Sequence, residues 1–474
     1  MLAPRALRQW IDALPLGNPP RAAQMLLQQL RLLVRDPQPG ARLGALLDLY
    51  DVPGGQLLEI VNERLQTNQE GAVPLDQLEH SMLELLTELA YGRLRQANEA
   101  LAGGKSPATA TLYQAMRLLD GVQNIERLHY YTLDPGNWQL LLGIYLHAAA
   151  QDVADQPVDR ALLRSGDEPD TVQGLFFRAL VLQLCDPHQH RPEQMLSWHH
   201  WAGEHANLLE LTILPQGPFA IPLDISGQLP PLAAARRGKP GPDMRYLAAE
   251  RFLQQLQDDP TAPQDLQRTL HELIKGRKAS EQRQGPRQPR NHRYGLMNGL
   301  RNIHARLESL IQGAEQHDQD LAQVPCLLVN QSRSGAALQV QGPLSPPLTV
   351  GEVLLIEAQT PAPGGAAVGF AACIRRLVNG ADHQIEIGVE KLAGRVIPVE
   401  ITGSAAQRGR GETRALLQQD VEAGRHTLFA PRSFYREGDS LVAESAHARH
   451  GLRMQELLEV VQHTAIIAVE PEDA

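Results

Sequence analysis

The stretch VNQSRSGAALQV, residues 329–340, decides the fold, because around it the hydrophobic pattern of the chain changes from helical to strand-like. It follows EQRQGPRQPRNHRYG, residues 281–295, in which arginines crowd together. From Lys275 to Arg306 the chain has nine basic residues and a single acid, Glu281, although its formal net charge is −10. This local excess of positive charge predicts an anionic ligand, held where the two halves of the protein meet.

The composition is that of a soluble globular protein with two to four domains. The chain has 474 residues, of which 43% are apolar, 21% charged and only 4% aromatic, so Leu, Ala and Val must build the core. The acidic total argues against a partner that is a nucleic-acid polymer. No apolar run approaches the length of a membrane span, about 20 residues. The N-terminus lacks the continuous apolar core of a signal peptide, because Arg8 and Asp12 interrupt it. Three widely spaced cysteines indicate reduced thiols, so we expect a cytoplasmic protein.

The first 275 residues are predicted to form a large, irregular all-α domain. Apolar residues recur at i, i+3, i+4 and i+7, and proline- or glycine-rich breaks separate these runs, as in antiparallel helix pairs. Trp138, Leu141 and Tyr145 follow the spacing of a tetratricopeptide helix, but no second copy occurs at a 34-residue offset. A solenoid therefore stays open as an alternative. The clearest helical runs are residues 21–34, 55–66, 75–101 and 138–152.

Three shorter segments lead from this domain toward the strands. Residues 213–243 are predicted to be a loop or short extended segment, followed by a helix from Met244. Residues 276–295 have the composition of a basic linker. Residues 296–312 return to the helical pattern.

After Gln323 the hydrophobic period is two, which predicts strands. Six short strands with no helix between them favour a small antiparallel β-barrel, which we assign with its preceding helix to residues 296–402. The remaining β-rich segment, 403–474, either extends this barrel or forms a second unit against it. The predicted fold class is therefore α+β and multidomain. The six strands are expected at 326–332, 336–342, 348–359, 366–377, 383–392 and 396–401.

Residues 280–400 resemble the PilZ domain family. NQSRSG, with Asn330, Ser332 and Gly335, fits the family signature [D/N]-x-S-x-x-G, and RQGPR, with Arg283 and Arg287, fits its R-x-x-x-R. The resemblance implies a six-stranded barrel that binds the bacterial second messenger cyclic di-GMP. The whole chain is similar to longer proteobacterial members with a helical N-terminal region.

The chemistry of these residues suits such a ligand. An arginine guanidinium matches phosphate oxygens and the O6 and N7 acceptors of guanine. Asn330 offers an amide and Ser332 a hydroxyl, while Gly335 is expected to have a positive φ that turns the chain back. No other cofactor and no metal are expected. The predicted ligand-binding residues are Arg283, Arg287, Arg290, Arg293, Asn330, Ser332 and Gly335.

One feature departs from the family pattern. PilZ domains run from the arginine motif almost directly into the first strand, whereas here the predicted helix 296–312 separates Arg287 from Asn330. Either this helix is an insertion or the arginines that bind ligand lie elsewhere. Arg301 and Arg306 are then the other candidates.

The arginine stretch and the turn also have interpretations that involve no ligand. The arginine stretch can be a solvated linker, and Asn330 and Ser332 can simply cap a turn. The alternative function is then a scaffold whose barrel no longer binds nucleotide. In either case the helical domain would bind an unidentified protein partner. The resemblance to the PilZ family suggests motility as the process. The sequence has no P-loop, G-x-S-x-G or H-E-x-x-H motif, so no enzyme is predicted. The histidines between Cys185 and His205 are expected to be structural.

Overall fold

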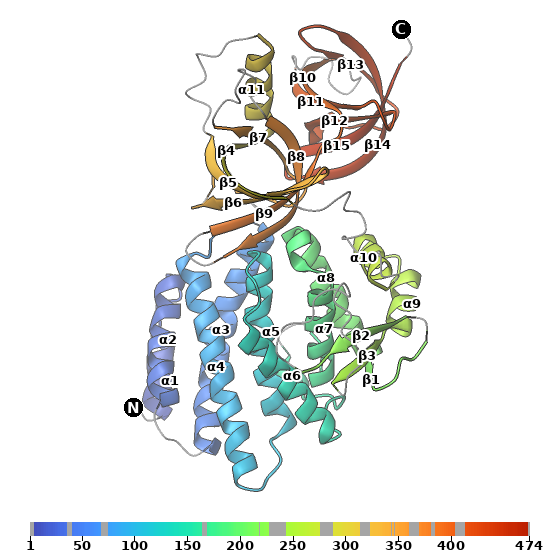
Figure 1. Ribbon diagram of the computed structural model, residues 1–474. Helices are drawn as coiled ribbons and strands as arrows, with labels where there is room; N and C mark the ends of the chain where they lie inside the picture. The colour runs from blue at the N-terminus through green and yellow to red at the C-terminus, as the bar shows by residue number, and fades with distance from the viewer. Residues whose placement is uncertain are drawn as a thin grey trace. The chain divides into compact units, whose positions relative to one another are not determined.

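A computed structural model shows two compact units (Figure 1). We call them the helical unit (Met1–Gln69 and Pro74–Glu281) and the barrel unit (Gln282–Ala474, with Glu70–Val73). This division agrees with the predicted fold class, a helical N-terminal domain followed by β-barrels. The structure describes residues 4–35, 40–67, 74–163, 168–217, 219–226, 243–274, 288–312, 323–342, 344–345, 347–359, 369–380, 384–402 and 413–472.

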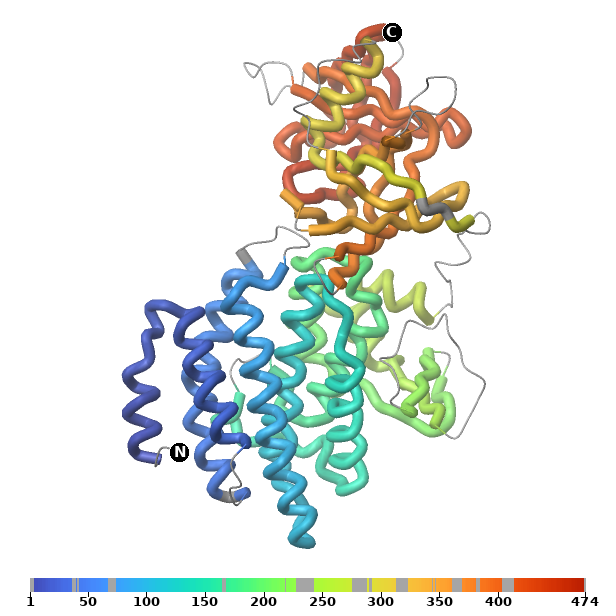
Figure 2. Tube along the Cα trace, turned by 60° about the vertical axis from the view of Figure 1, so that its left-hand side comes forward, coloured from blue at the N-terminus to red at the C-terminus, as the bar shows by residue number. Residues whose placement is uncertain are grey.

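The first half of the helical unit is a series of long helices that lie side by side (Figure 2). Their Leu- and Ala-rich stripes share one core. Helix α4 begins with a capping box. The Asp76 side chain accepts a hydrogen bond from the Glu79 backbone N–H, and the Glu79 side chain accepts one from the Asp76 backbone N–H. The helices are α1 (Pro4–Asp12), α2 (Pro19–Arg35), α3 (Gly40–Thr67), α4 (Gln77–Ala102), α5 (Thr109–Leu128), α6 (Pro135–Ala150), α7 (Val172–Leu184) and α8 (Pro192–His205).

Helix α4 packs between α3 and α5, and Gly92 makes part of this packing possible. A Cβ on Gly92 would lie 3.0 Å from both methyl groups of Leu47 on α3 and 3.5 Å from Val34 on α2. The glycine thus lets two helices approach the α4 backbone closely. The predicted helical runs are confirmed here, but the break expected at residues 51–55 was wrong, because α3 continues through Pro53.

The end of the helical unit departs from the all-α prediction. Strands β1 (Glu210–Thr212), β2 (Ala220–Asp224) and β3 (Met244–Ala248) form a small sheet in the order β1-β3-β2. The helix expected from Met244 was wrong at its start, because Met244–Ala248 pairs with both other strands. Helix α9 (Glu250–Asp258) begins after this strand and α10 (Gln264–Ile274) follows.

The first barrel is closed by six antiparallel strands, in the order β4-β5-β6-β9-β8-β7 (Figure 1). Helix α11 (Leu300–Gln312) follows β4, as the helical pattern from 296 to 312 predicted within a few residues. The strands are β4 (Gln288–Asn298), β5 (Val324–Gln331), β6 (Gly335–Gln341), β7 (Val353–Ala358), β8 (Gly369–Asn379) and β9 (Gln384–Lys391).

Two boundaries of the predicted barrel need correction. The segment from Gln288 to Gly295, assigned to a linker, is most of strand β4 and pairs with β5. Its arginines and proline hid its strand character. Conversely, Arg395–Thr402, predicted as the sixth strand, is β10 and pairs with β11 and β13 of a second barrel. The first barrel therefore begins with β4 and ends with β9.

The C-terminal segment forms a second closed barrel rather than an extension of the first. Its order is β10-β11-β12-β15-β14-β13. When each barrel is numbered from its own first strand, both orders become 1-2-3-6-5-4, so the two barrels have the same topology. The additional strands are β11 (Thr413–Asp420), β12 (Arg425–Pro431), β13 (Ser440–Glu444), β14 (Arg449–Val461) and β15 (Thr464–Pro471).

The two barrels pack through apolar side chains on their outer faces. Val353 and Cys373 of the first barrel share a buried cluster with Phe429 and Ile466 of the second. Ile303 of α11 belongs to the same cluster, so this helix contacts strands of both barrels. At about 25 cal/mol per Å² of buried apolar area, such a cluster holds the barrels together as one unit.

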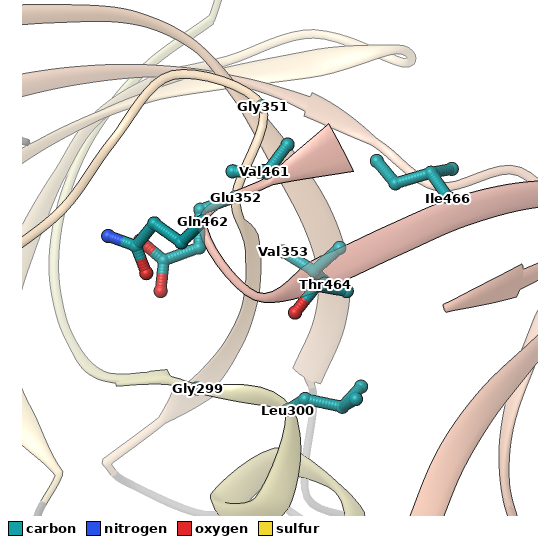
Figure 3. Close-up of a pocket in the computed structure, with 9 residues that line it drawn as sticks. All are labelled: Gly299, Leu300, Gly351, Glu352, Val353, Val461, Gln462, Thr464 and Ile466. Atoms are coloured by element: carbon teal, nitrogen blue, oxygen red, sulfur yellow. The ribbon is translucent and has the colours of Figure 1, made fainter. Parts of the chain in front are cut away.

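A cavity of about 50 Å³ lies beside this cluster (Figure 3). It is far smaller than the roughly 300–1,000 Å³ of ligand pockets, so it is not a nucleotide site. Glu352 lines it and accepts a hydrogen bond from the Thr349 backbone N–H at 3.2 Å. Burial raises the pKa of Glu352 to about 7. The other lining residues are Gly299, Leu300, Gly351, Val353, Val461, Gln462, Thr464 and Ile466.

Glu352 should make the stability of the barrel unit depend on pH. Because its pKa in the folded protein is raised above the unfolded value, its contribution is fully present below about pH 4.5 and is lost as pH rises through 7. Glu352→Gln should remove this decline, so that the variant is more stable than the native chain at pH 8. Hydrogen exchange of β7 measures the barrel unit, whereas tryptophan fluorescence follows only the helical unit, which holds all four tryptophans.

The exposed Glu422, changed to Gln, is the matched control and should leave the decline in place. A Glu352→Gln variant that keeps the native pH dependence in β7 would contradict the assignment.

Candidate ligand-binding site

The turn between β5 and β6 is closed by Ser332. Its backbone N–H donates to the Gly335 carbonyl at 2.8 Å, and its hydroxyl accepts from the Gly335 N–H at 3.1 Å. The predicted position of NQSRSG, at the turn between two strands, is confirmed. The hydroxyl of Ser332 thus has a structural use in the turn itself.

The same set of hydrogen bonds occurs in the second barrel. In the β13–β14 hairpin the Ser445 N–H donates to the Ala448 carbonyl at 2.8 Å, and the Ser445 hydroxyl accepts from the Ala448 N–H at 3.1 Å. That turn contains neither the asparagine nor the glycine of the signature. The serine contacts therefore account for a stable turn and do not by themselves indicate a ligand.

Gly335 is required for a different reason from the one predicted. Its φ is not positive, so the expected left-handed conformation was wrong. A Cβ built on Gly335 would lie 2.8 Å from the backbone carbonyl oxygen of Val389 on β9. The glycine is needed because β9 passes too close for any side chain.

Asn330 is the member of the signature whose side-chain oxygen has no hydrogen-bond partner in the part of the chain that the structure describes. Its side-chain Oδ1 is buried and has no partner among the residues that the structure describes. Leaving such an acceptor unsatisfied costs about 1–3 kcal/mol. Asn330 can therefore gain from a donor supplied by a ligand or by the neighbouring chain.

Strand β4 brings the basic stretch beside this turn. Pro289 pairs with Asn330 and Gln288 with Gln331. Arg293 is exposed and pairs with Leu327, three residues before Asn330 on β5. Arg290 lies on β4 between Pro289 and Arg293, whereas Arg283 and Arg287 lie outside the described residues. Since Arg287 directly precedes Gln288 in the chain, the arginine motif does run into the first strand of the barrel, and α11 is inserted after it.

A row of paired residues continues from Asn330 across the outside of the barrel. Ala337 lies between the buried Ala336 and Leu338, so its side chain faces outward, and the residues paired with it share that face. We call this set the outer row. Its members are Pro289, Asn330, Ala337, Gly388 and Arg376, on β4, β5, β6, β9 and β8.

Irregular strand pairing is concentrated on the outer row. Bulges re-aim side chains and are enriched beside functional sites. Each register shift found in the described pairing of the first barrel has one end on this row, which makes it the best-supported location for a site. The shifts fall between Pro289 and His292, Leu328 and Asn330, and Ile374 and Arg376.

Two arginines, one in the turn and one at the far end of the outer row, were missed from the sequence. Arg333 is exposed in the turn, and no ion pair to it is found within the part of the chain that the structure describes. Arg333 lies within the signature, at a position where the pattern accepts any residue. Arg376 entered the outer row only through the pairing of β8 with β9, which no local pattern revealed.

The other two arginine candidates are not brought to the turn. Arg306 forms an ion pair with the buried Glu357, with 3.0 Å between Nε and Oε2. Arg301 is exposed on α11. Neither residue belongs to the outer row.

The histidines near Cys185 have partners of other kinds. His190 contacts Trp198 with tilted rings, 4.5 Å between centroids, and His205 stacks on Trp201 at 4.2 Å. His199 lies 3.4 Å from Asp120, which also pairs with the buried Arg178, and burial lowers the pKa of His199 to about 4. No group of three potential metal ligands occurs in the described ranges.

Comparison with known families points to the helical unit. A family model described as "Cyclic-di-GMP receptor FimW, N-terminal domain" matches residues 5–216, somewhat less than half of the chain. This stretch is similar to that domain, which supports a cyclic di-GMP receptor and names no enzymatic activity. No curated protein matches the chain. No helix within the described residues is long and apolar enough to cross a membrane.

Gly335→Ala should destabilise the barrel unit. The new methyl group would meet the Val389 carbonyl oxygen at 2.8 Å, and overpacking of this kind costs about 1–3 kcal/mol. Hydrogen exchange should therefore increase in β6 and β9. Gly451→Ala is the control, because its Cβ would meet no atom closer than 3.5 Å. Equal effects of the two substitutions would show that the close approach of β9 does not matter.

Proposed function

We propose that the chain is a cyclic di-GMP effector whose first barrel is PilZ-like and binds the nucleotide. The ligand lies between the arginine stretch of Arg283, Arg287, Arg290 and Arg293 and the turn from Asn330 to Gly335. The observation that carries this proposal is the pairing of Pro289 with Asn330, because it aligns the arginine stretch with the turn. Electrostatic attraction and forked hydrogen bonds from guanidinium groups to phosphates then provide the binding energy.

Two independent features support the same ligand. The family match covers residues 5–216 and shares no residue with the turn or the arginine stretch. The signature and its pairing with β4 lie wholly within the barrel unit. A family description that names cyclic di-GMP thus supports the ligand that the PilZ resemblance of the barrel implies and that the barrel residues suit chemically.

The proposed response is a change in the arrangement of the two units. The arginine stretch joins the helical unit to β4, so a ligand that binds arginines in this stretch constrains the connection between the units. The helical unit would pass the change to a protein partner, in the cytoplasm. Motility is the process that the PilZ resemblance suggests.

The alternative is a scaffold whose barrel binds no nucleotide. The observation that favours it is the Ser332 hydroxyl, which is already used within the turn. A scaffold predicts that the arginines are dispensable and that the protein partner binds equally well with or without nucleotide.

Calorimetric titration of the full chain with cyclic di-GMP tests the ligand. We expect binding with a Kd of the order of 10 µM or tighter. Arg287→Ala combined with Arg290→Ala should weaken binding at least about tenfold, because each lost phosphate contact is charge-assisted. The melting temperature should not change. If folded protein gives no heat of binding with cyclic di-GMP at concentrations of the order of 10 µM, the scaffold is favoured instead.

A matched control comes from the second barrel. Arg395 pairs with Gln419 just as Pro289 pairs with Asn330, and Arg425 pairs with Asp420 at the end of the corresponding turn. Both arginines are exposed. Arg395→Ala combined with Arg425→Ala removes the same charge and should leave the affinity unchanged.

Small-angle X-ray scattering tests the response. Saturating cyclic di-GMP should change the radius of gyration of the native chain, because binding constrains the connection between the units. The variant with Arg287→Ala and Arg290→Ala should show no change at the same ligand concentration. A native chain that binds the ligand in calorimetry but scatters identically with and without it would reject the rearrangement while leaving binding intact.

A further inference from the structure

Two very small residues lie side by side in the middle of the outer row. Ala337 and Gly388 are directly paired on β6 and β9, and Asn330 and Arg376 flank them on β5 and β8. With strands about 4.8 Å apart, the row from Asn330 to Arg376 spans roughly 14 Å. We call Ala337 and Gly388 the flat patch, because neither carries more than one methyl group.

Gly388 has a specific structural cause. Glycine weakens the interior of a strand and often marks a place where another group approaches closely. A Cβ on Gly388 would lie 3.1 Å from the Cβ of Arg376. The β8 bulge next to Arg376 thus brings this arginine close to β9, and a side chain at residue 388 would require one strand to shift by a few tenths of an ångström.

Carboxylates border the flat patch along β9. Glu386 and Glu390 are both exposed and lie two residues before and after Gly388, so all three share one face at intervals of about 7 Å. Glu390 pairs with Arg375, with 2.8 Å between Nε and Oε2. Arg375 offsets the charge of Glu390, but the negative charge of Glu386 on the other side disfavours a phosphate on the patch. The phosphates suit the other end of the row, where β4 carries its arginines.

We propose that the flat patch is the subsite for a guanine base of the ligand, with Arg376 as the residue that selects guanine. This inference rests on the proposed function and adds a base-reading subsite to it. The base lies against Ala337 and Gly388. The guanidinium of Arg376 donates to the O6 and N7 acceptors of guanine, and Glu386 accepts from its N–H donors.

Adenine cannot make the same contacts. It keeps the N7 acceptor but presents an amino group where guanine has O6, so it opposes a donor of Arg376 with a second donor. It also lacks the amino group that would donate to Glu386. The patch should therefore discriminate between cyclic di-GMP and cyclic di-AMP, which carry the same phosphates.

The experiment compares both nucleotides by calorimetry on the full chain. The native chain should bind cyclic di-GMP at least about tenfold more tightly than cyclic di-AMP, the discrimination of one good bidentate contact. Arg376→Ala should abolish that preference by weakening cyclic di-GMP alone. Arg375→Ala, one residue away and paired with Glu390, is the matched control and should keep the preference.

Two further variants distinguish recognition from misfolding. Arg376→Lys keeps the charge but not the fork, so it should lose most of the preference while the chain stays folded. Glu386→Gln should also reduce the preference, with an unchanged melting temperature.

The possible outcomes separate this inference from the proposed function. If Arg376 variants bind both nucleotides as the native chain does, or lose both equally, the guanine subsite is wrong although the effector function stands. If the native chain binds neither nucleotide, the proposed function itself fails and the subsite fails with it.

Discussion

Closure of the first barrel by β4 is the constraint on which the barrel unit depends. This strand pairs with β5 on one side and β7 on the other, so without it both neighbours would have an open edge. Its C-terminal part, Leu296–Asn298, is buried, whereas Arg293 in the middle of the strand is exposed. A shift of one residue would move Leu296 out of the core, so burial at one end of β4 fixes which residues pair at the other. Core packing thus fixes the pairing from Leu296 back to His292, and across the bulge Pro289 comes to lie beside Asn330.

The same pairing explains why a strand in a closed barrel can be so polar. Only the C-terminal part of β4 contributes to the core, and the bulge between Pro289 and His292 separates it from the N-terminal part. The N-terminal part is free to carry residues chosen for another purpose. Arg293, just beyond the bulge, is exposed, which is consistent with a ligand as the reason for the local excess of charge.

Much of this architecture was visible in the sequence because it depends on local pattern. Helical periodicity located α2, the second half of α3, α4, α6 and α11, and alternation located the strands from β5 onward. β4 was missed because proline and arginine are depleted in strands, and its pairing with β5 and β7 overrides that preference. Gly335 was found for the wrong reason, since the carbonyl of Val389 lies more than fifty residues away in the chain. Arg376 was missed because the bulge that places it depends on β9.

The second barrel shows that the turn, and not the topology, distinguishes the candidate site. Both barrels have the same strand order, and four residues separate the last β5–β6 pair, Gln331 and Ala336, as they do the last β11–β12 pair, Asp420 and Arg425. In this alignment Gln419, Val421 and Glu422 stand where the first barrel has Asn330, Ser332 and Arg333.

The β11–β12 turn is acidic and therefore repels phosphates. No cluster of arginines precedes β10 in the sequence. The outer face of the second barrel is used differently, since Phe429 and Ile466 pack against the first barrel. The two barrels thus share one topology within a single unit, and in the proposed function a few side chains at one turn and on one strand decide which barrel binds the anion.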